Sequence, residues 1–163
     1  MPFPLDHRGE ISWTILSGRD PEWECDAFLN AVVEQLEREK ANDILVTGNR
    51  VAFKGGMFRL VNNWNRLVSI SSGYIEAVPA NGRVVVTYYL SYRQLLIFAS
   101  VGVLLMGLVL SGDNSSPVEV KLAIVVFGWL WLFGINFLIS VGRFPGLIDR
   151  AMESRALPPE DRV

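Results

Sequence analysis

The feature that most constrains this chain is an uninterrupted apolar stretch of 21 residues, 122–142, in which no side chain is charged. At about 1.5 Å of rise per residue, a helix of this length crosses the roughly 30 Å hydrocarbon core of a bilayer. A second uncharged stretch, residues 95–110, contains 16 residues. Core helices of soluble proteins keep a polar stripe, and these stretches have none. We therefore predict transmembrane helices at 94–111 and 122–142 rather than two buried helices of a soluble bundle.

The segment between the two predicted helices, residues 112–121, has the composition of a short external loop. It is rich in Gly, Ser, Asp and Asn, as is typical of a tight connection between antiparallel helices. Basic residues flanking membrane helices concentrate on the cytoplasmic side. We therefore expect a transmembrane hairpin in the bacterial inner membrane, with the N- and C-termini cytoplasmic. The arginines behind this orientation are Arg83 and Arg93 before the first helix, and Arg143, Arg150 and Arg155 after the second.

The stretch 122–142 contains residue types that are unusual in the middle of a membrane helix. Asn136 carries an amide that is costly to leave unpaired in hydrocarbon, and Trp129 lies seven residues before it, on the same face of a regular α-helix. Glycine residues let helix backbones approach closely. The contact could lie within the hairpin, with a second copy or partner protein, or with a bound lipid or pigment. We expect a helix-packing or partner interface at Gly102, Gly107, Gly128, Trp129, Trp131, Gly134 and Asn136.

Residues 1–93 have the pattern of a cytoplasmic α+β domain. Asp20-Pro21, followed by acidic residues, predicts the start of an N-terminal helix at 21–41. Gly48-Asn49 and Asn81-Gly82 are typical of hairpin turns. The last strand leads directly into the first membrane helix, so the domain should lie close to the bilayer. We expect an antiparallel β-sheet of about five strands, at 11–16, 44–47, 50–54, 67–78 and 83–92, with a possible short strand at 57–62.

Charge is divided unevenly within this domain. Residues 1–43 hold four basic and ten acidic side chains, whereas residues 44–93 hold six basic and one acidic. The basic part predicts contact with anionic lipid headgroups. The alternative is that the basic residues pair with the acidic helix, at Glu34, Glu37 and Glu39. The predicted lipid-contact residues are Arg50, Lys54, Arg59, Arg66, Arg83 and Arg93.

The segment after the second membrane helix, residues 143–163, contains an amphipathic pattern. Leu147, Ile148, Ala151 and Met152 fall on one helical face, and the charged residues fall mostly on the other. This pattern predicts a short helix lying on the cytoplasmic membrane interface, followed by a tail.

The sequence offers little material for catalysis. His7 is the only histidine and Cys25 the only cysteine, so neither a metal site nor a nucleophile and base pair can be assembled from them. A net charge of −2 disfavours nucleic acid as a partner. We therefore expect no metal, no cofactor and no enzymatic activity. A membrane-bound hydrolase or transferase would need a cofactor or partner to supply the chemistry.

Two functions fit these expectations. The first is a two-pass membrane protein whose cytoplasmic domain is a docking or scaffolding surface, as an accessory or assembly subunit. Its partners would be membrane lipid and either a second copy or a larger membrane protein complex. The second is a sensor of anionic lipid or a small ligand, anchored at the inner leaflet.

Overall fold

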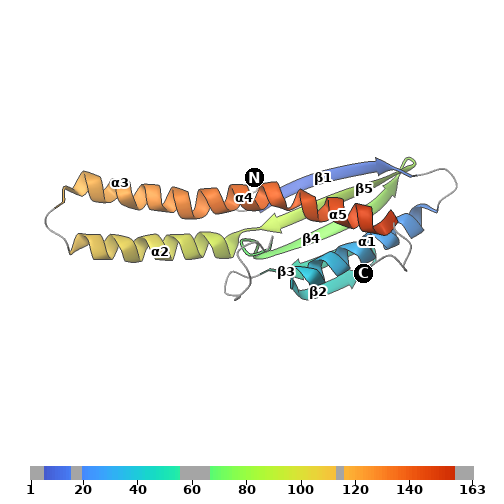
Figure 1. Cartoon of the computed structure of the whole chain (residues 1–163), viewed down its shortest axis with the longest axis horizontal. Coiled ribbons are helices and arrows are strands. Elements are labelled where there is room, and N and C mark those ends of the chain that lie inside the picture. The colour runs from blue at the N-terminus through green and yellow to red at the C-terminus, as the bar shows by residue number, and fades with distance from the viewer. Residues whose placement is uncertain (1–5, 16–19, 56–66, 113–115, 157–163) are drawn as a thin grey trace.

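The computed structural model describes residues 6–15, 20–55, 67–112 and 116–156. The molecule is elongated, with two long helices at one end and a sheet with its covering helices at the other (Figure 1). The elements in chain order are β1 (Asp6–Thr14), α1 (Pro21–Arg38), β2 (Asn42–Thr47), β3 (Arg50–Lys54), β4 (Ser72–Ala80), β5 (Arg83–Ser91), α2 (Arg93–Ser111), α3 (Val118–Trp129), the π-helical segment η1 (Leu130–Ile135), α4 (Asn136–Arg143) and α5 (Pro145–Ala156).

The strands form one five-stranded sheet in the order β1-β5-β4-β3-β2, and every neighbouring pair is antiparallel. This confirms the predicted antiparallel sheet. Asn81 and Gly82 both adopt positive φ, 51° and 73°, as the turn between β4 and β5 requires. The predicted strand bounds were wrong for β1, which already begins at Asp6 and ends at Thr14, and for β4, which begins at Ser72 because residues 67–69 form a turn. The possible strand at 57–62 lies outside the described residues.

Helix α1 begins as its sequence indicates and ends earlier. The Asp20 side chain accepts a hydrogen bond from the Glu22 backbone N–H, at 3.0 Å, and Pro21 occupies the first turn. At the other end Lys40 adopts a left-handed φ of 55°. Its N–H donates to the Glu37 carbonyl, and the Ala41 N–H donates to the Leu36 carbonyl. This paired bonding is a Schellman motif, which stops the helix at Arg38 before the predicted end at residue 41.

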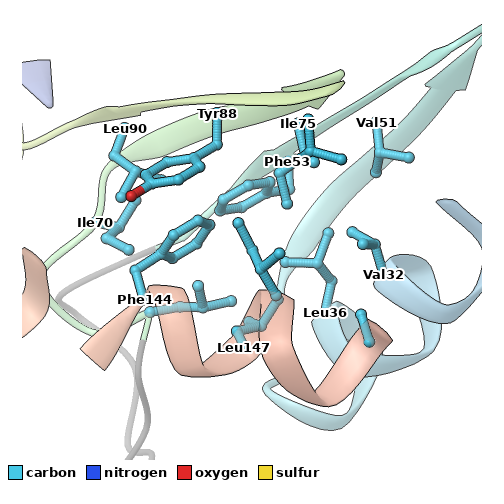
Figure 2. Packing of buried hydrophobic residues seen from close by; sticks show 14 of the residues in the cluster. Val32, Leu36, Val51, Phe53, Ile70, Ile75, Tyr88, Leu90, Phe144 and Leu147 are labelled. Atoms are coloured by element: carbon cyan, nitrogen blue, oxygen red, sulfur yellow. The ribbon is translucent and has the colours of Figure 1, made fainter. Parts of the chain in front are cut away.

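Helices α1 and α5 lie together on one face of the sheet, which we call the inner face, and a single apolar core fills the space between them (Figure 1). Phe144, just before α5, lies between the rings of Phe53 and Tyr88, with centroid distances of 6.3 and 5.2 Å. Figure 2 shows Phe144 and Leu147 packed against sheet residues on one side and Leu36 of α1 on the other. Since Leu147, Ile148 and Ala151 are buried in this core, the expectation that this helix lies on the membrane interface was wrong.

Two helices in the described residues are long and apolar enough to cross a membrane. The first is α2, with 19 residues, and the second runs for 37 residues from Val118 to Ser154 through α3, η1, α4 and α5. The helices α2 and α3 lie side by side (Figure 1). Most of their apolar side chains are exposed. No charged side chain lies between Leu95 and Leu110 or between Leu122 and Gly142.

Candidate membrane and docking surfaces

Two glycines lie in the contact between the two long helices. A Cβ atom at Gly128 would lie 2.7 Å from Met106 Cε, and one at Gly107 would lie 3.6 Å from Val125 Cγ2. Real Cβ atoms do not approach other atoms as closely as 2.7 Å, so a side chain at Gly128 would displace Met106. Gly128 therefore leaves room for the Met106 side chain of α2, whereas a Cβ atom at Gly107 would make only an ordinary van der Waals contact.

An aromatic column runs along the inside of the second long helix. Trp129 stacks on Phe133 at 5.1 Å, Phe133 stacks on Phe137 at 5.8 Å, and Phe137 meets Tyr92 edge-on at 4.8 Å. The Trp129 indole N–H also donates to Ser100 Oγ of α2, at 3.3 Å. The column therefore extends from the contact with α2 to the point where the sheet meets the helices, because Tyr92 lies between β5 and α2.

The π-helical segment determines which residues belong to this column. A regular α-helix has 3.6 residues per turn, so residues spaced by four drift around it, whereas a π turn holds more residues. The segment Leu130–Ile135 therefore keeps Trp129, Phe133 and Phe137 in line. It also separates Trp129 from Asn136, which is exposed and does not share the Trp129 face. The expectation that these two residues lie on one face was wrong for this reason.

The remaining predicted interface residues do not contact the neighbouring long helix. Trp131 is 57% exposed and its ring lies 6.1 Å from that of Phe127, one turn away on the same helix. A Cβ atom added at Gly102 or Gly134 would meet nothing within 4 Å. Thus Gly107, Gly128 and Trp129 come together in the α2–α3 contact, whereas Gly102, Trp131, Gly134 and Asn136 do not.

Two buried hydroxyl groups lie where the sheet joins the long helices. Tyr92 is fully buried, and Ser140 of α4 is 4% exposed. Burial raises the pKa of the Tyr92 hydroxyl, and hydrogen bonding with Ser140 partly offsets this. Neither hydroxyl oxygen has a hydrogen bond of ordinary geometry among the described residues. The junction between the sheet and the long helices is thus buried.

The strand register gives the distance of each basic residue from the start of α2. In the strand register Lys54 lies opposite Ser72, and Ser72 lies opposite Ser91 at the end of β5. Lys54 therefore lies in the same row of the sheet as the junction with α2. Arg50 lies four residues further along its strand, about 13 Å away, and Arg83 lies eight residues from Ser91, about 27 Å away. If α2 enters the bilayer near Arg93, Lys54 and Arg93 are the two described members of the predicted lipid-contact set that are placed to reach headgroups. Arg59 and Arg66 lie outside the described residues.

Two basic residues of the sheet, Arg50 and Lys54, form ion pairs with acidic residues of neighbouring strands. Arg50 forms a 3.0 Å ion pair with Glu76 of β4 and stacks over the Tyr74 ring at 4.3 Å. Lys54 forms a 2.8 Å ion pair with Asp43 of β2, which raises the pKa of Lys54 by hydrogen bonding and by charge attraction. Neither partner belongs to α1. The alternative that these two residues pair with Glu34, Glu37 or Glu39 was therefore wrong.

The sheet face opposite α1 and α5, which we call the outer face, carries an aromatic row. Register places five residues from the five strands side by side: Arg8, Tyr89, Tyr74, Ala52 and Leu45. The two tyrosine rings stack at 5.4 Å. A hydrogen bond with Asp6 is the main cause of a raised pKa of Tyr89. Leu45 is 62% exposed on the edge strand. Sequence reasoning missed this row because it depends on register.

A groove of about 470 Å³ lies beside this row, toward the end of the sheet that meets α2. It is lined by β2, β3 and β4, including Leu45, Ala52, Lys54 and Ser72. A β-bulge between Asn42 and Leu45, with Asp43 at a φ of 47°, interrupts the regular pairing of β2 here. The groove and the aromatic row together form a partly apolar surface next to the membrane end of the domain.

No group of three or more His, Cys, Asp or Glu side chains that could hold a metal ion occurs in the part of the chain that the structure describes. Cys25 is buried in the core beneath α1. The fold and surfaces define a five-stranded α+β domain joined to two long apolar helices. No family model matches the chain, and no curated protein or solved structure is similar to it.

Proposed function

We propose that this chain is a two-pass integral membrane protein whose α+β domain docks a partner protein at the cytoplasmic surface of the membrane. In this role it is a non-enzymatic accessory or assembly subunit of a larger membrane complex. The observation that carries the proposal is the second long helix. Its first part has exposed apolar side chains, and its last part, α5, completes the core of the domain.

This arrangement supports a rigid attachment between domain and membrane. The strand β5 leads into α2 through the buried Tyr92, and α4 leads into α5 through the buried Phe144. The domain is thus held by two chain connections instead of one flexible linker. Domains attached in this way keep a fixed height and a fixed face toward a partner on the same membrane, which suits a docking function.

The outer face is the surface we assign to the partner. Its stacked tyrosines and the exposed Leu45 provide amphipathic contact area, and aromatic residues are enriched in protein interfaces. Two of its basic residues are already paired, Arg50 with Glu76 and Lys54 with Asp43. A protein surface of mixed polarity fits this pattern better than a polyanion.

Photo-cross-linking in intact cells tests this assignment. A benzophenone amino acid at Leu45 is expected to give a discrete cross-linked partner, whereas the same group at Asn30, which is exposed on α1, is not. Equal adducts from both positions, or none from Leu45 in cells that express the protein at its natural level, would count against docking through the outer face.

A second candidate function, recognition of anionic lipid, rests on the position of Lys54 and Arg93 at the level where α2 begins. Native mass spectrometry of the purified chain can count anionic lipids that remain bound. Arg93→Gln should reduce that number in this case, and Arg83→Gln should not, since Arg83 lies about 27 Å further away. Equal retention by both variants would dispose of lipid recognition.

A further inference from the structure

Asn136, the first residue of α4, has an incompletely satisfied amide on the outside of the second long helix. Its Nδ2 donates one hydrogen bond to the Leu132 carbonyl, at 2.7 Å, one turn earlier on the same helix. The second amide hydrogen and the Oδ1 oxygen have no partner among the described residues. Asn136 is exposed in the single chain.

The position of Asn136 makes this exposure costly in a membrane. Arg143 follows Asn136 by seven positions in the helix, so Asn136 lies about 10 Å from that arginine along the helix axis, within the apolar stretch. Leu132 and Ile139, four residues before and three residues after it, are 36% and 45% exposed and flank it on the same side of the helix. We call these three residues the Asn136 flank. An amide surrounded by hydrocarbon gains by finding a hydrogen-bonding partner on another helix.

A second copy of this chain can supply the hydrogen-bonding partner of Asn136 without any other polar residue. An amide is both donor and acceptor, so two amides can exchange hydrogen bonds with each other. Two copies inserted in the same orientation hold Asn136 at the same depth, and a two-fold axis along the membrane normal brings the two side chains together. Gly128 packs against Met106 of α2 within one chain, so it is not available for a contact between two copies.

We propose that the Asn136 flank is the contact between two copies of this chain, with the two Asn136 amides paired across a two-fold axis. This inference rests on the proposed membrane insertion and adds the partner and the contacting atoms. The π-helical segment has a part in it, because it directs Trp129 and Phe133 toward α2 while Asn136 faces outward.

The test measures dimer dissociation of the full chain by energy transfer between labelled copies in liposomes of increasing lipid-to-protein ratio. Asn136→Leu should raise the dissociation constant roughly 10-fold, since it removes both reciprocal hydrogen bonds. Asn136→Gln keeps an amide and should restore most of the dimer. Leu138→Ala, on the opposite and 68% exposed side of the helix, should leave the dissociation constant unchanged.

Cysteine cross-linking provides an independent readout with the amide intact. In a Cys25→Ser background, Ile139→Cys should form a disulfide-linked dimer in membranes, and Leu138→Cys should not. A dissociation constant unchanged by Asn136→Leu, or cross-linking at residue 138 in preference to 139, would overturn the inference. Alkaline extraction of the same membranes distinguishes a failure of the dimer contact from a failure of membrane insertion. Release of the wild-type chain into the aqueous fraction would overturn the proposed function as well.

Discussion

One helix of this protein has two parts in opposite surroundings. Between Val118 and Arg143 its large apolar side chains are mostly exposed, whereas Phe144, Leu147, Ile148 and Ala151 are at most 1% exposed. Burying a large apolar side chain is worth roughly 1.5 to 3 kcal/mol, and the exposed part forgoes that gain in water. The chain itself shields α5, and in our proposal the bilayer shields α3 and α4. A bilayer is the medium that fits their length.

The strongest way to test this comparison is to remove one part of the helix at a time. A chain that stops at Arg143 lacks Phe144 and α5, so the inner face and α1 lose the residues that cover them. We expect the domain to lose its folded core and become fully sensitive to protease. The double change Asp149→Ala and Arg150→Ala alters only exposed positions of α5 and should leave the protease resistance intact. Equal resistance of the truncated and full chains would contradict the role given to α5.

A smaller effect is expected from two phenylalanines of this helix. Phe144→Ala should lower the free energy of unfolding of the domain by about 3 to 5 kcal/mol, because its ring is packed between Phe53 and Tyr88. Phe127, which is 65% exposed, has no such surroundings within the chain, and Phe127→Ala should change that free energy little. Denaturant unfolding of the domain in detergent solution, followed by near-ultraviolet circular dichroism, measures both. A comparable loss of unfolding free energy in both variants would contradict the difference between the exposed and the buried part of the helix.

A third comparison uses the two tryptophans of the exposed part. Trp129→Phe keeps an aromatic ring next to Phe133 but removes the hydrogen bond to Ser100, which should weaken the contact between the long helices by roughly 0.6 to 2 kcal/mol. Trp131→Phe removes no hydrogen bond and should have little effect. Unfolding of the helices in mixed detergent measures the difference. A larger loss for Trp131→Phe would show that Trp131 has the more important partner.

The smallest effect concerns the edge of the sheet. The ion pair with Asp43 raises the pKa of Lys54 above its ordinary value of 10.5. Because the folded-state pKa is the higher one, the stabilisation is fully present below the unfolded pKa and is lost as the pH rises through the folded pKa. Asp43→Asn should therefore move the Lys54 pKa down, as an alkaline NMR titration of its side chain would detect. An unchanged pKa would mean that the pair does not persist in solution.

The sequence predicted the sheet because its signals are local. Asn81-Gly82 specifies the hairpin between β4 and β5, and alternation of apolar residues identifies the strands. The two long apolar helices followed from length and charge alone. The role of α5 could not be predicted in this way, since the Leu147 and Ile148 pattern shows an apolar face but not what covers it. A membrane surface and a protein core require the same pattern.

The sites were harder to predict because they depend on register and on one irregular turn. Arg50 and Arg83 belong to the same basic part of the sequence, yet the register puts them at different distances from α2. The π-helical segment has no strong residue signal, although the four-residue spacing of Trp129, Phe133 and Phe137 is compatible with it. It changes which face of the helix holds Asn136.

The most direct measurement of membrane insertion is the labelling of single cysteines in liposomes with a water-soluble maleimide. In a Cys25→Ser background, Phe127→Cys lies in the exposed apolar part of the helix and Ser12→Cys lies on the outer face of the sheet. We expect Ser12→Cys on the accessible side to react rapidly and Phe127→Cys to react only after the liposomes are dissolved in denaturant. Equal and rapid labelling of both positions in intact liposomes would contradict a membrane-spanning helix.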